Sequence, residues 1–383
     1  MYTVFKGGLV YNTAMREFVR ADILCENGII VDADCKSVPA ECEVVDCTGL
    51  YVIPGLVDVH SHGRTKNDFN YADREAVCAL RKSYAASGTT TLMATLASAT
   101  KESLLASMEA IAQNRDVVPG MATIAGTHLE GRYLNPKRRG AHATELLCPL
   151  DADELSEFIG KMLPLPIHVS CAPELEGGET FIKTAKSFGA TCGMVHSDAT
   201  YEESMKAVEW GVTSFTHTYN AMRPIHHREP GNMVASLLTD CAYSEFICDG
   251  EHSHPMMIAM ASRLKPADKL ILVTDSMEAA GCEDGEYAIA GLPVYVKNGR
   301  AVNSEGALAG STLDLFTAVC NYMKFTGKTL EETVPCATSN PAAMLGIDNV
   351  CGRIENGLRA DFVLIENKES PVRKAVYAGG VRV

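Results

Sequence analysis

Short apolar segments alternate with amphipathic segments through the middle of this 383-residue chain. Strands alternating with helices of 10–15 residues are typical of βαβ units that build a parallel sheet. Eight such units predict an α/β fold of the (β/α)8, TIM-like barrel type, and no G-x-G-x-x-G motif follows the first strand to favour a dinucleotide-binding fold. The expected strands cover residues 51–59, 89–95, 121–127, 166–171, 191–195, 212–216, 244–248 and 270–274. Expected helices cover 73–87, 101–114, 153–162, 180–188, 202–210, 255–264 and 313–325.

The two ends of the chain follow a different pattern. Residues 1–50 and 351–383 contain short strand-like segments separated by turns, and neither part is large enough to form a core alone. We expect them to pair into one small β-sandwich domain beside a barrel that spans 51–350. The turn-rich stretch 285–306 predicts a β-hairpin inserted after the eighth barrel strand.

Charge and composition exclude several classes of protein. Lys and Arg number 34 against 48 Asp and Glu, a net charge of −14, which argues against a general basic surface for nucleic acid. The N-terminus does not resemble a signal peptide, and no apolar run approaches the 18 or so residues of a membrane span. The 14 cysteines are scattered without a C-x-x-C pair, which predicts reduced thiols and a cytoplasmic location.

Residues that bind metals recur where the predicted strands end. His60 and His62 end the first strand two residues apart, so both imidazoles can face one point. Alone, this pair fits a metal site and an ordinary polar strand end about equally well. Barrel active sites form at the carboxyl ends of the strands, and six of the eight strands carry such residues there. The others are Glu130, His196, His217, the run Asp249–His252, and Asp275.

The residue types suggest separate roles. Glu130, His196 and His217 provide one carboxylate and two imidazoles, a set that leaves a coordination position open in catalytic zinc sites. His60 and His62 could hold a second ion, with Glu130 bridging the two.

A carboxylate and several cations complete the candidate site. Asp275 suits a general base that takes a proton from the attacking water and returns it to the leaving group. Basic residues cluster at 137–139 and at 223–228, and guanidinium groups suit phosphate oxygens. Arg228 is the strongest candidate for an anion contact, whereas 137–139 fits a solvated loop equally well.

The strand-end pattern resembles the amidohydrolase superfamily, and longer motifs are similar to those of the N-acetylglucosamine-6-phosphate deacetylase family. These motifs span nearly the whole chain. The most specific are H-L-E-G, H-x-Y-N-A-M and H-R-E-P-G. The matching stretches are Pro54–Asp58, His128–Gly131, Asn135–His142, Phe215–Met222, His227–Gly231, Asp249–His252, Val273–Asp275, Leu308–Thr312, Asn340–Ala343 and Gly357–Asp361.

The resemblance implies a metal-dependent hydrolase. It implies one or two divalent ions per subunit, with zinc preferred and iron, manganese or cobalt as alternatives. The metal would be held by Glu130, His196 and His217, with Asp275 as the acid and base. His252 would help to polarise the acetamide carbonyl.

The resemblance also implies how the sugar phosphate is bound. His142 would contact a sugar hydroxyl. The phosphate would be held by Asn220, the backbone of Ala221, and Arg228. In the family the matching arginine reaches the phosphate bound by the neighbouring subunit, so a homodimer is expected.

The predicted reaction is hydrolysis of the acetamide of N-acetyl-D-glucosamine 6-phosphate. One alternative is another N-acetylhexosamine phosphate, such as N-acetylgalactosamine 6-phosphate. A cyclic-amide hydrolase of the same superfamily commonly needs a lysine on the fourth strand, and 166–171 has none. A non-catalytic sugar-phosphate-binding protein is the third alternative, and the intact ligand set with Asp275 argues against it.

Two stretches depart from the family pattern. Residues 63–67 replace a glycine-rich loop, and Arg132-Tyr133 replaces a proline after H-L-E-G. Both changes add positive charge, so we hypothesise that Arg64 or Arg132 adds to anion binding. His168 is expected to be a core histidine, and His128 is expected to support Glu130 from behind.

Overall fold

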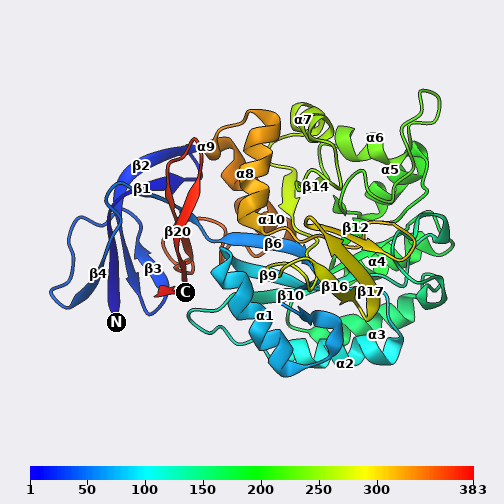
Figure 1. Ribbon diagram of the computed structural model, residues 1–383, viewed down its shortest axis with the longest axis horizontal. Coiled ribbons are helices and arrows are strands. Elements are labelled where there is room, and N and C mark those ends of the chain that lie inside the picture. Colours follow the sequence, from blue (N-terminus) through cyan, green and yellow to red (C-terminus); the bar gives the residue numbers. More distant parts are fainter.

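The computed structural model describes residues 1–383 and contains an eight-stranded parallel sheet that curls into a barrel (Figure 1). The predicted (β/α)8 fold is confirmed. Nearly every residue of these strands is buried, as expected for parallel strands covered on both faces. In sheet order they are β6 (Leu56–Ser61), β9 (Thr89–Leu96), β10 (Thr123–Glu130), β11 (Ile167–Cys171), β12 (Thr191–Met194), β13 (Ser214–Phe215), β14 (Tyr243–Ile247) and β15 (Leu270–Val273).

The barrel closes between β6 and the segment that follows β15. The Asp275 N–H donates to the His60 carbonyl at 2.9 Å, and the His62 N–H donates to the Ser276 carbonyl at 2.8 Å. Below them the Thr274 hydroxyl donates to the buried Asp58 carboxylate at 2.6 Å. These bonds join the first and last strands at the carboxyl end of the barrel, where the candidate residues lie.

Amphipathic helices cover the outside of the barrel. In α3, Asp151 caps the N-terminus through the N–H groups of two residues, and the buried face follows the helical period at Leu155, Phe158, Ile159 and Met162. The seven expected helices are present, and three more, α6, α9 and α10, were not predicted. The helices are α1 (Arg74–Ala86), α2 (Lys101–Ala112), α3 (Ala152–Met162), α4 (Gly178–Ser187), α5 (Tyr201–Trp210), α6 (Gly231–Leu238), α7 (Pro255–Leu264), α8 (Leu315–Thr326), α9 (Leu330–Thr333) and α10 (Ser339–Leu345).

The prediction of a single strand over residues 51–59 was wrong, because two strands cover this stretch. Tyr51–Pro54 forms β5, which pairs with strands of the chain ends, and the barrel strand begins only at Leu56. Gly55 lies at the break. A Cβ on Gly55 would lie 2.1 Å from the Thr90 Oγ1 atom and 2.8 Å from the Asp361 Cβ atom, so the two units approach each other too closely for a side chain.

Strands from both chain ends form a second sheet beside the barrel, with the blue and red strands side by side in Figure 1. The expected β unit from both termini is present as one connected sheet that surrounds its own core. Phe5, Phe362 and Tyr377 meet edge to face in that core. The strands are β1 (Tyr2–Asn12), β2 (Glu17–Glu26), β3 (Ile29–Asp32), β4 (Cys42–Asp46), β5, β19 (Phe362–Glu366), β20 (Val372–Ala378) and β21 (Val381–Arg382).

The insertion after β15 is larger than the predicted hairpin. It is a three-stranded antiparallel sheet of β16 (Gly285–Ile289), β17 (Leu292–Lys297) and β18 (Arg300–Asn303). A short pair, β7 (Gly63–Arg64) and β8 (Asn67–Asp68), follows the first barrel strand. Across the whole chain, none of the helices combines the length and apolar character needed to cross a membrane. The domain limits at 50 and 350 stay a prediction.

The close approach at Gly55 generates a stability prediction. We expect Gly55→Ala to lower the free energy of unfolding by about 1–3 kcal/mol, because the new methyl group displaces Thr90 and Asp361. Gly160→Ala is the matched control: Gly160 is exposed on α3 with open space around it, and alanine there should stabilise the chain by about 0.5–1 kcal/mol. Chemical denaturation measures both, and equal effects would contradict the prediction.

Candidate active site

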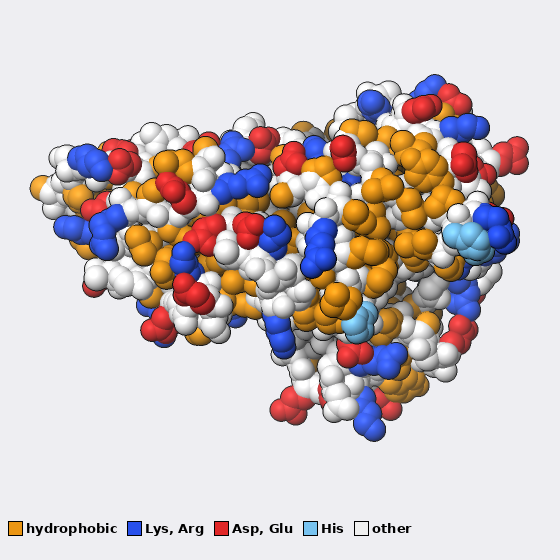
Figure 2. All heavy atoms as spheres, turned by 90° about the horizontal axis from the view of Figure 1, so that it is seen from above, with side chains coloured by type: hydrophobic (Ala, Val, Ile, Leu, Met, Phe, Trp, Pro, Cys, Tyr) orange, Lys and Arg blue, Asp and Glu red, His pale blue; other side chains and the backbone are white.

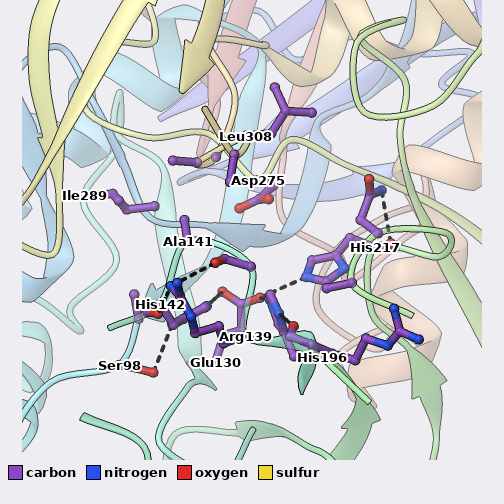
Figure 3. A pocket seen from close by; sticks show the side chains of 18 of the residues that line it. Ser98, Glu130, Arg139, Ala141, His142, His196, His217, Asp275, Ile289 and Leu308 are labelled. Atoms are coloured by element: carbon purple, nitrogen blue, oxygen red, sulfur yellow. Dashed lines mark hydrogen bonds and ion pairs between the residues drawn. The ribbon is translucent and has the colours of Figure 1, made fainter. Parts of the chain in front are cut away.

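Glu130 is the centre of the site. It ends β10, only 3% of its surface is exposed, and its two oxygens face different histidines. Its Oε1 atom lies 3.0 Å from the His217 Nε2 atom and 3.5 Å from the His196 Nε2 atom. Its Oε2 atom lies 3.0 Å from the His62 Nε2 atom and 3.3 Å from the His60 Nε2 atom. One carboxylate therefore stands between two pairs of imidazoles, and Figure 3 shows it beside His196 and His217.

Asp275 completes the side of the cluster that holds His60 and His62. Its Oδ1 atom lies 3.4 Å from the His60 Nε2 atom and 3.2 Å from the His62 Nε2 atom. One imidazole nitrogen from each of His60 and His62 and one carboxylate oxygen from each of Glu130 and Asp275 lie within 4.8 Å of one another. Imidazole nitrogens and carboxylate oxygens are the donors that zinc and other divalent transition metals prefer, so the residues present fit a metal centre.

The backbone turns sharply where three of these side chains leave their strands. His196, His217 and Asp275 each have a positive φ, of 43°, 29° and 49°. Each lies two residues beyond its strand. Non-glycine residues adopt the left-handed region at a cost and cluster at functional sites when they do. This conformation aims the three side chains into the mouth of the barrel.

Buried charges set the protonation of the cluster. Burial alone would lower the pKa of His62, but the carboxylates of Asp275 and Glu130 raise it to about 9. The same two carboxylates hold the pKa of His60 well above its usual value against the effect of burial. Burial would raise the pKa of Asp275, but His60 and His62 lower it to about 2. Asp275 is therefore ionised at neutral pH and able to accept a proton.

His252 is held by a carboxylate that the sequence analysis did not assign. Its Nδ1 atom lies 2.6 Å from the Asp249 Oδ2 atom, and Asp249 also accepts the His252 N–H at 2.9 Å. Burial opposes a charge on His252, but Asp249 raises its pKa above the usual value. His252 lines the same cavity as Asp275, so it can donate a hydrogen bond there.

His142 reaches the cluster from the loop after β10. Its Nδ1 atom lies 2.9 Å from the Ser98 hydroxyl, as Figure 3 shows, and its Nε2 atom lies 3.9 Å from the Glu130 Oε2 atom. Burial lowers its pKa to about 3, and His196 adds to the effect, so His142 is neutral. It is farther from Glu130 than the four strand-end histidines are, which suits a contact with substrate.

These residues surround one cavity of about 490 Å³, a size that fits a small ligand. Asn220 and Ala221 lie on its wall, and the Ala221 N–H, in a left-handed residue with φ of 50°, has no acceptor within the chain. Ile289 and Leu308 form an apolar wall, and Ile289 comes from the inserted sheet (Figure 3). Neither apolar residue stands at the end of a barrel strand, so the strand-end pattern did not indicate them.

The first basic cluster lies at the cavity rim, where acidic residues neutralise part of it. The Asp198 Oδ1 atom accepts the Arg138 Nε–H at 2.9 Å, and the Arg223 Nε–H donates to the Asp198 carbonyl at 2.8 Å. Arg139 pairs with Glu305 at 2.7 Å. Asp198 lies two residues after His196, so its position near a strand end was the signal that could have indicated it.

Arg228 lies outside the cavity. It is exposed on the loop before α6, and its Nη1 atom lies 2.8 Å from the His227 Nε2 atom. Within one chain, Arg228 does not meet the other residues expected to bind phosphate.

Neither Arg64 nor Arg132, which were hypothesised to add to anion binding, lines the cavity. Arg132 pairs with Glu154, with Nε 3.1 Å from Oε1, and donates to the Ala99 carbonyl at 3.0 Å, away from the cavity. Arg64 packs against Gly281 and does not line the cavity. The charge of Arg132 is therefore used in a local ion pair with Glu154.

The predictions for His168 and His128, two histidines outside the cavity, had different outcomes. His168 is a core residue as expected, with its Nδ1 atom 2.8 Å from the Thr191 hydroxyl. His128 does not contact Glu130. Its ring instead packs edge-on against His60, with the ring centres 4.6 Å apart, and its Nε2 atom lies 2.8 Å from the Ser170 hydroxyl.

The fold and the cluster together define a barrel enzyme with a divalent-metal centre. The amidohydrolase family matches residues 51–383, so the chain belongs to the amidohydrolase family. All the named strand-end residues lie within this match.

Curated relatives cover most of this chain. An N-acetylglucosamine-6-phosphate deacetylase of Vibrio furnissii is 33% identical over 343 residues, which are 89% of this chain and 86% of that protein. An N-acetylgalactosamine-6-phosphate deacetylase of Escherichia coli O157:H7 is 32% identical over 329 residues, 86% of this chain and 87% of that protein.

Solved structures share the whole fold. The N-acetylglucosamine-6-phosphate deacetylase of Thermotoga maritima has a TM-score of 0.85, 32% identity, and 99% coverage of both chains. A mutant of the N-acetyl-D-glucosamine-6-phosphate deacetylase of Mycobacterium smegmatis, in complex with N-acetyl-D-glucosamine-6-phosphate, has a TM-score of 0.90 and 30% identity, covering 100% of this chain and 98% of that one.

The raised pKa values of His60 and His62 predict how metal affinity depends on pH. A cation must displace the protons that these imidazoles hold, so metal affinity should rise as pH rises through the His62 pKa of about 9. Each proton that the metal displaces should change the apparent metal affinity by about tenfold per pH unit. Competition against a chelator at pH 6 to 10 measures this, with calorimetry in two buffers counting the released protons. An affinity that is flat across that range would contradict the prediction.

Proposed function

We propose that this protein hydrolyses the acetamide of N-acetyl-D-glucosamine 6-phosphate to D-glucosamine 6-phosphate and acetate. The observation that carries this proposal is the meeting of Asp275, His252 and the Glu130 cluster on one cavity that also exposes the Ala221 N–H. The names of relatives that span most of the chain support the same reaction. A reaction of this kind belongs in the cytoplasm, where phosphorylated sugars are kept.

The metal would be held by residues of the cluster. Glu130, His196 and His217 would hold one ion, and His60 and His62 would help to hold a second. Zinc suits this set of nitrogen and oxygen donors, and iron, manganese and cobalt suit it too. When bound, a divalent cation supplies Lewis acidity, which polarises the acetamide carbonyl and lowers the pKa of water toward about 7.

The chain's own groups move the protons and hold the charge. Asp275, ionised at neutral pH, accepts a proton from the water that attacks the carbonyl carbon. His252, held by Asp249, donates a hydrogen bond to the oxygen as negative charge develops on it. Asp275 then gives its proton to the departing nitrogen as the C–N bond breaks, which leaves acetate and a free amine.

Substrate is oriented by groups around the reacting carbon. His142 is neutral and points into the cavity, where it can bind a sugar hydroxyl. The Asn220 side chain and the Ala221 N–H lie on the same wall and suit the phosphate. Ile289 and Leu308 provide an apolar surface for the acetyl methyl group and help to exclude water.

We further propose that the enzyme is a homodimer in which Arg228 reaches the phosphate in the partner subunit. Arg228 is exposed and cannot serve its own cavity. Figure 2 shows hydrophobic side chains gathered on the barrel half of this face, with basic and histidine side chains at its edge. Exposed apolar residues near this loop and on the helices that follow it are Ile225, Leu238, Met256 and Leu264. A second copy of the chain would cover such a surface.

N-acetylgalactosamine 6-phosphate is the second candidate substrate, because a deacetylase named for it is 32% identical to this chain. The two sugars differ only in the configuration of one hydroxyl. Relative kcat/KM values for the two phosphates decide between them, and a clear preference for the galactosamine form would replace the first proposal. A cyclic-amide hydrolase is disfavoured because β11 carries no lysine.

The catalytic assignment is tested by acetate release from N-acetyl-D-glucosamine 6-phosphate by the metal-loaded protein. Asp275→Asn should lower kcat by about 10²–10⁴, because the acid and base are lost together. Asp268→Asn, an exposed change at the opposite end of β15, is the control and should leave kcat unchanged. An unmodified protein that binds the sugar phosphate without releasing acetate would instead indicate a non-catalytic binding protein.

The role of Arg228 is tested by mixing subunits. Arg228→Ala alone should raise KM for the phosphorylated sugar by about 10–100-fold, because a charge-assisted hydrogen bond is lost. After subunit exchange with Asp275→Asn, hybrid dimers should regain a normal KM, since one site keeps Asp275 and receives Arg228 from its partner. A monomer in solution, or no recovery in the mixture, would contradict the proposal.

A further inference from the structure

A buried carboxylate lies beneath the cluster and has no part in the reaction described above. Glu245 is the only acidic or basic residue of β14, and it is 0% exposed inside the barrel. Barrel interiors are normally filled by apolar side chains. A buried carboxylate is costly unless it is paired with other groups. Its position therefore calls for a partner.

Among the buried polar atoms that lack a hydrogen bond, two face each other. They are the Glu245 Oε2 atom and the His60 Nδ1 atom, both fully enclosed, and they are 3.9 Å apart. Buried polar groups without a partner are rare in folded proteins. A small rotation of either side chain would bring the pair into hydrogen-bond range.

The other nitrogen of His60 points the opposite way. Its Nε2 atom lies 3.3 Å from the Glu130 Oε2 atom, 3.4 Å from the Asp275 Oδ1 atom and 3.2 Å from the His62 Nε2 atom. His60 thus presents Nε2 to the cluster and Nδ1 to Glu245. A histidine that binds a metal commonly donates its second N–H to a carboxylate or carbonyl, which fixes the tautomer and the ring.

His196 already has this arrangement on the other side of the cluster. Its Nδ1 atom lies 2.7 Å from the Arg138 carbonyl oxygen, which requires the N–H on Nδ1 and leaves Nε2 free. The His62 and His217 Nδ1 atoms have no partner. Of the histidines at the second metal position, only His60 therefore has a carboxylate behind it.

Neighbouring groups hold Glu245 in place from below. Its Oε1 atom accepts the Ser214 hydroxyl at 2.8 Å, and the His168 Nε2 atom lies 3.8 Å away. Gly193 leaves the space for these polar groups, since a Cβ there would lie 2.9 Å from the His168 Nε2 atom. With Oε1 bound, Oε2 is the oxygen left for His60.

We propose that Glu245 is a positioning residue for the second metal ion, acting through His60. Its carboxylate accepts the His60 Nδ1–H, holds the ring, and leaves the Nε2 lone pair directed at the cluster. This inference rests on the metal centre of the proposed function and specifies it further. The chain carries both H-x-H and the buried carboxylate behind it, and together they make this a two-ion enzyme.

Metal titration of the ion-free protein tests the proposal without measuring activity. The unmodified protein should bind two ions per subunit by elemental analysis and chelator competition. Glu245→Leu should bind the second ion about 10–100-fold more weakly, the usual cost of losing the partner of a metal-ligating histidine, with the first ion unaffected. Glu245→Gln keeps an oxygen that can accept the His60 Nδ1–H, so this variant should lose less affinity for the second ion than Glu245→Leu.

A double-mutant cycle separates positioning from a general loss of structure. In a His60→Asn background, Glu245→Leu should have no further effect on the second ion, because the two act through one ring. His168→Asn changes the same buried network away from His60 and should leave both ions bound. Additive losses, an equal effect of His168→Asn, or a single ion in the unmodified protein would overturn the proposal. A single ion with normal acetate release would overturn it and leave the proposed function standing.

Discussion

The arrangement of the site depends on one buried carboxylate placed among four imidazoles. Glu130 has one oxygen facing His196 and His217 and the other facing His60 and His62. A carboxylate this deeply buried is costly unless several positive or hydrogen-bonding groups surround it. The histidines meet that need in the ion-free chain, and a cation held by the same histidines would meet it when bound. The same electrostatic demand thus accounts for the compact cluster and for its affinity for metals.

Barrel closure is what allows that cluster to exist. His60 belongs to the first barrel strand and Asp275 follows the last, and the backbone bond between them closes the sheet at the level of the site. Residues more than 200 positions apart in sequence thereby come within 3.4 Å. The sheet built from both chain ends meets the barrel at Gly55, just before the first barrel strand, where Thr90 and Asp361 leave no room for a side chain.

Much of this organisation could be predicted from the pattern of residues. Buried parallel strands are recognisable as apolar runs, and polar residues that end such runs are placed together at one face by the fold. Glu130, His196 and His217 were identified on that basis. The break at Gly55 could not be seen, because a continuous apolar run hides a change of sheet. The ion pair of Arg132 with Glu154 was also hidden, since the direction of a side chain on a loop depends on neighbours distant in sequence.

The barrel, the unit made by both ends, and the residue types gathered at the strand ends follow from the order of residues alone, because strand and helix periodicity and the rule for parallel sheets are local or topological. Three features depend instead on three-dimensional packing: which nitrogen of each histidine faces the cluster, which oxygen of Glu130 faces which pair, and what stands behind His60. Those relations depend on side-chain rotation and on contacts between strands far apart in the chain. Periodicity reports which face a residue occupies, but the direction of a lone pair is fixed by packing.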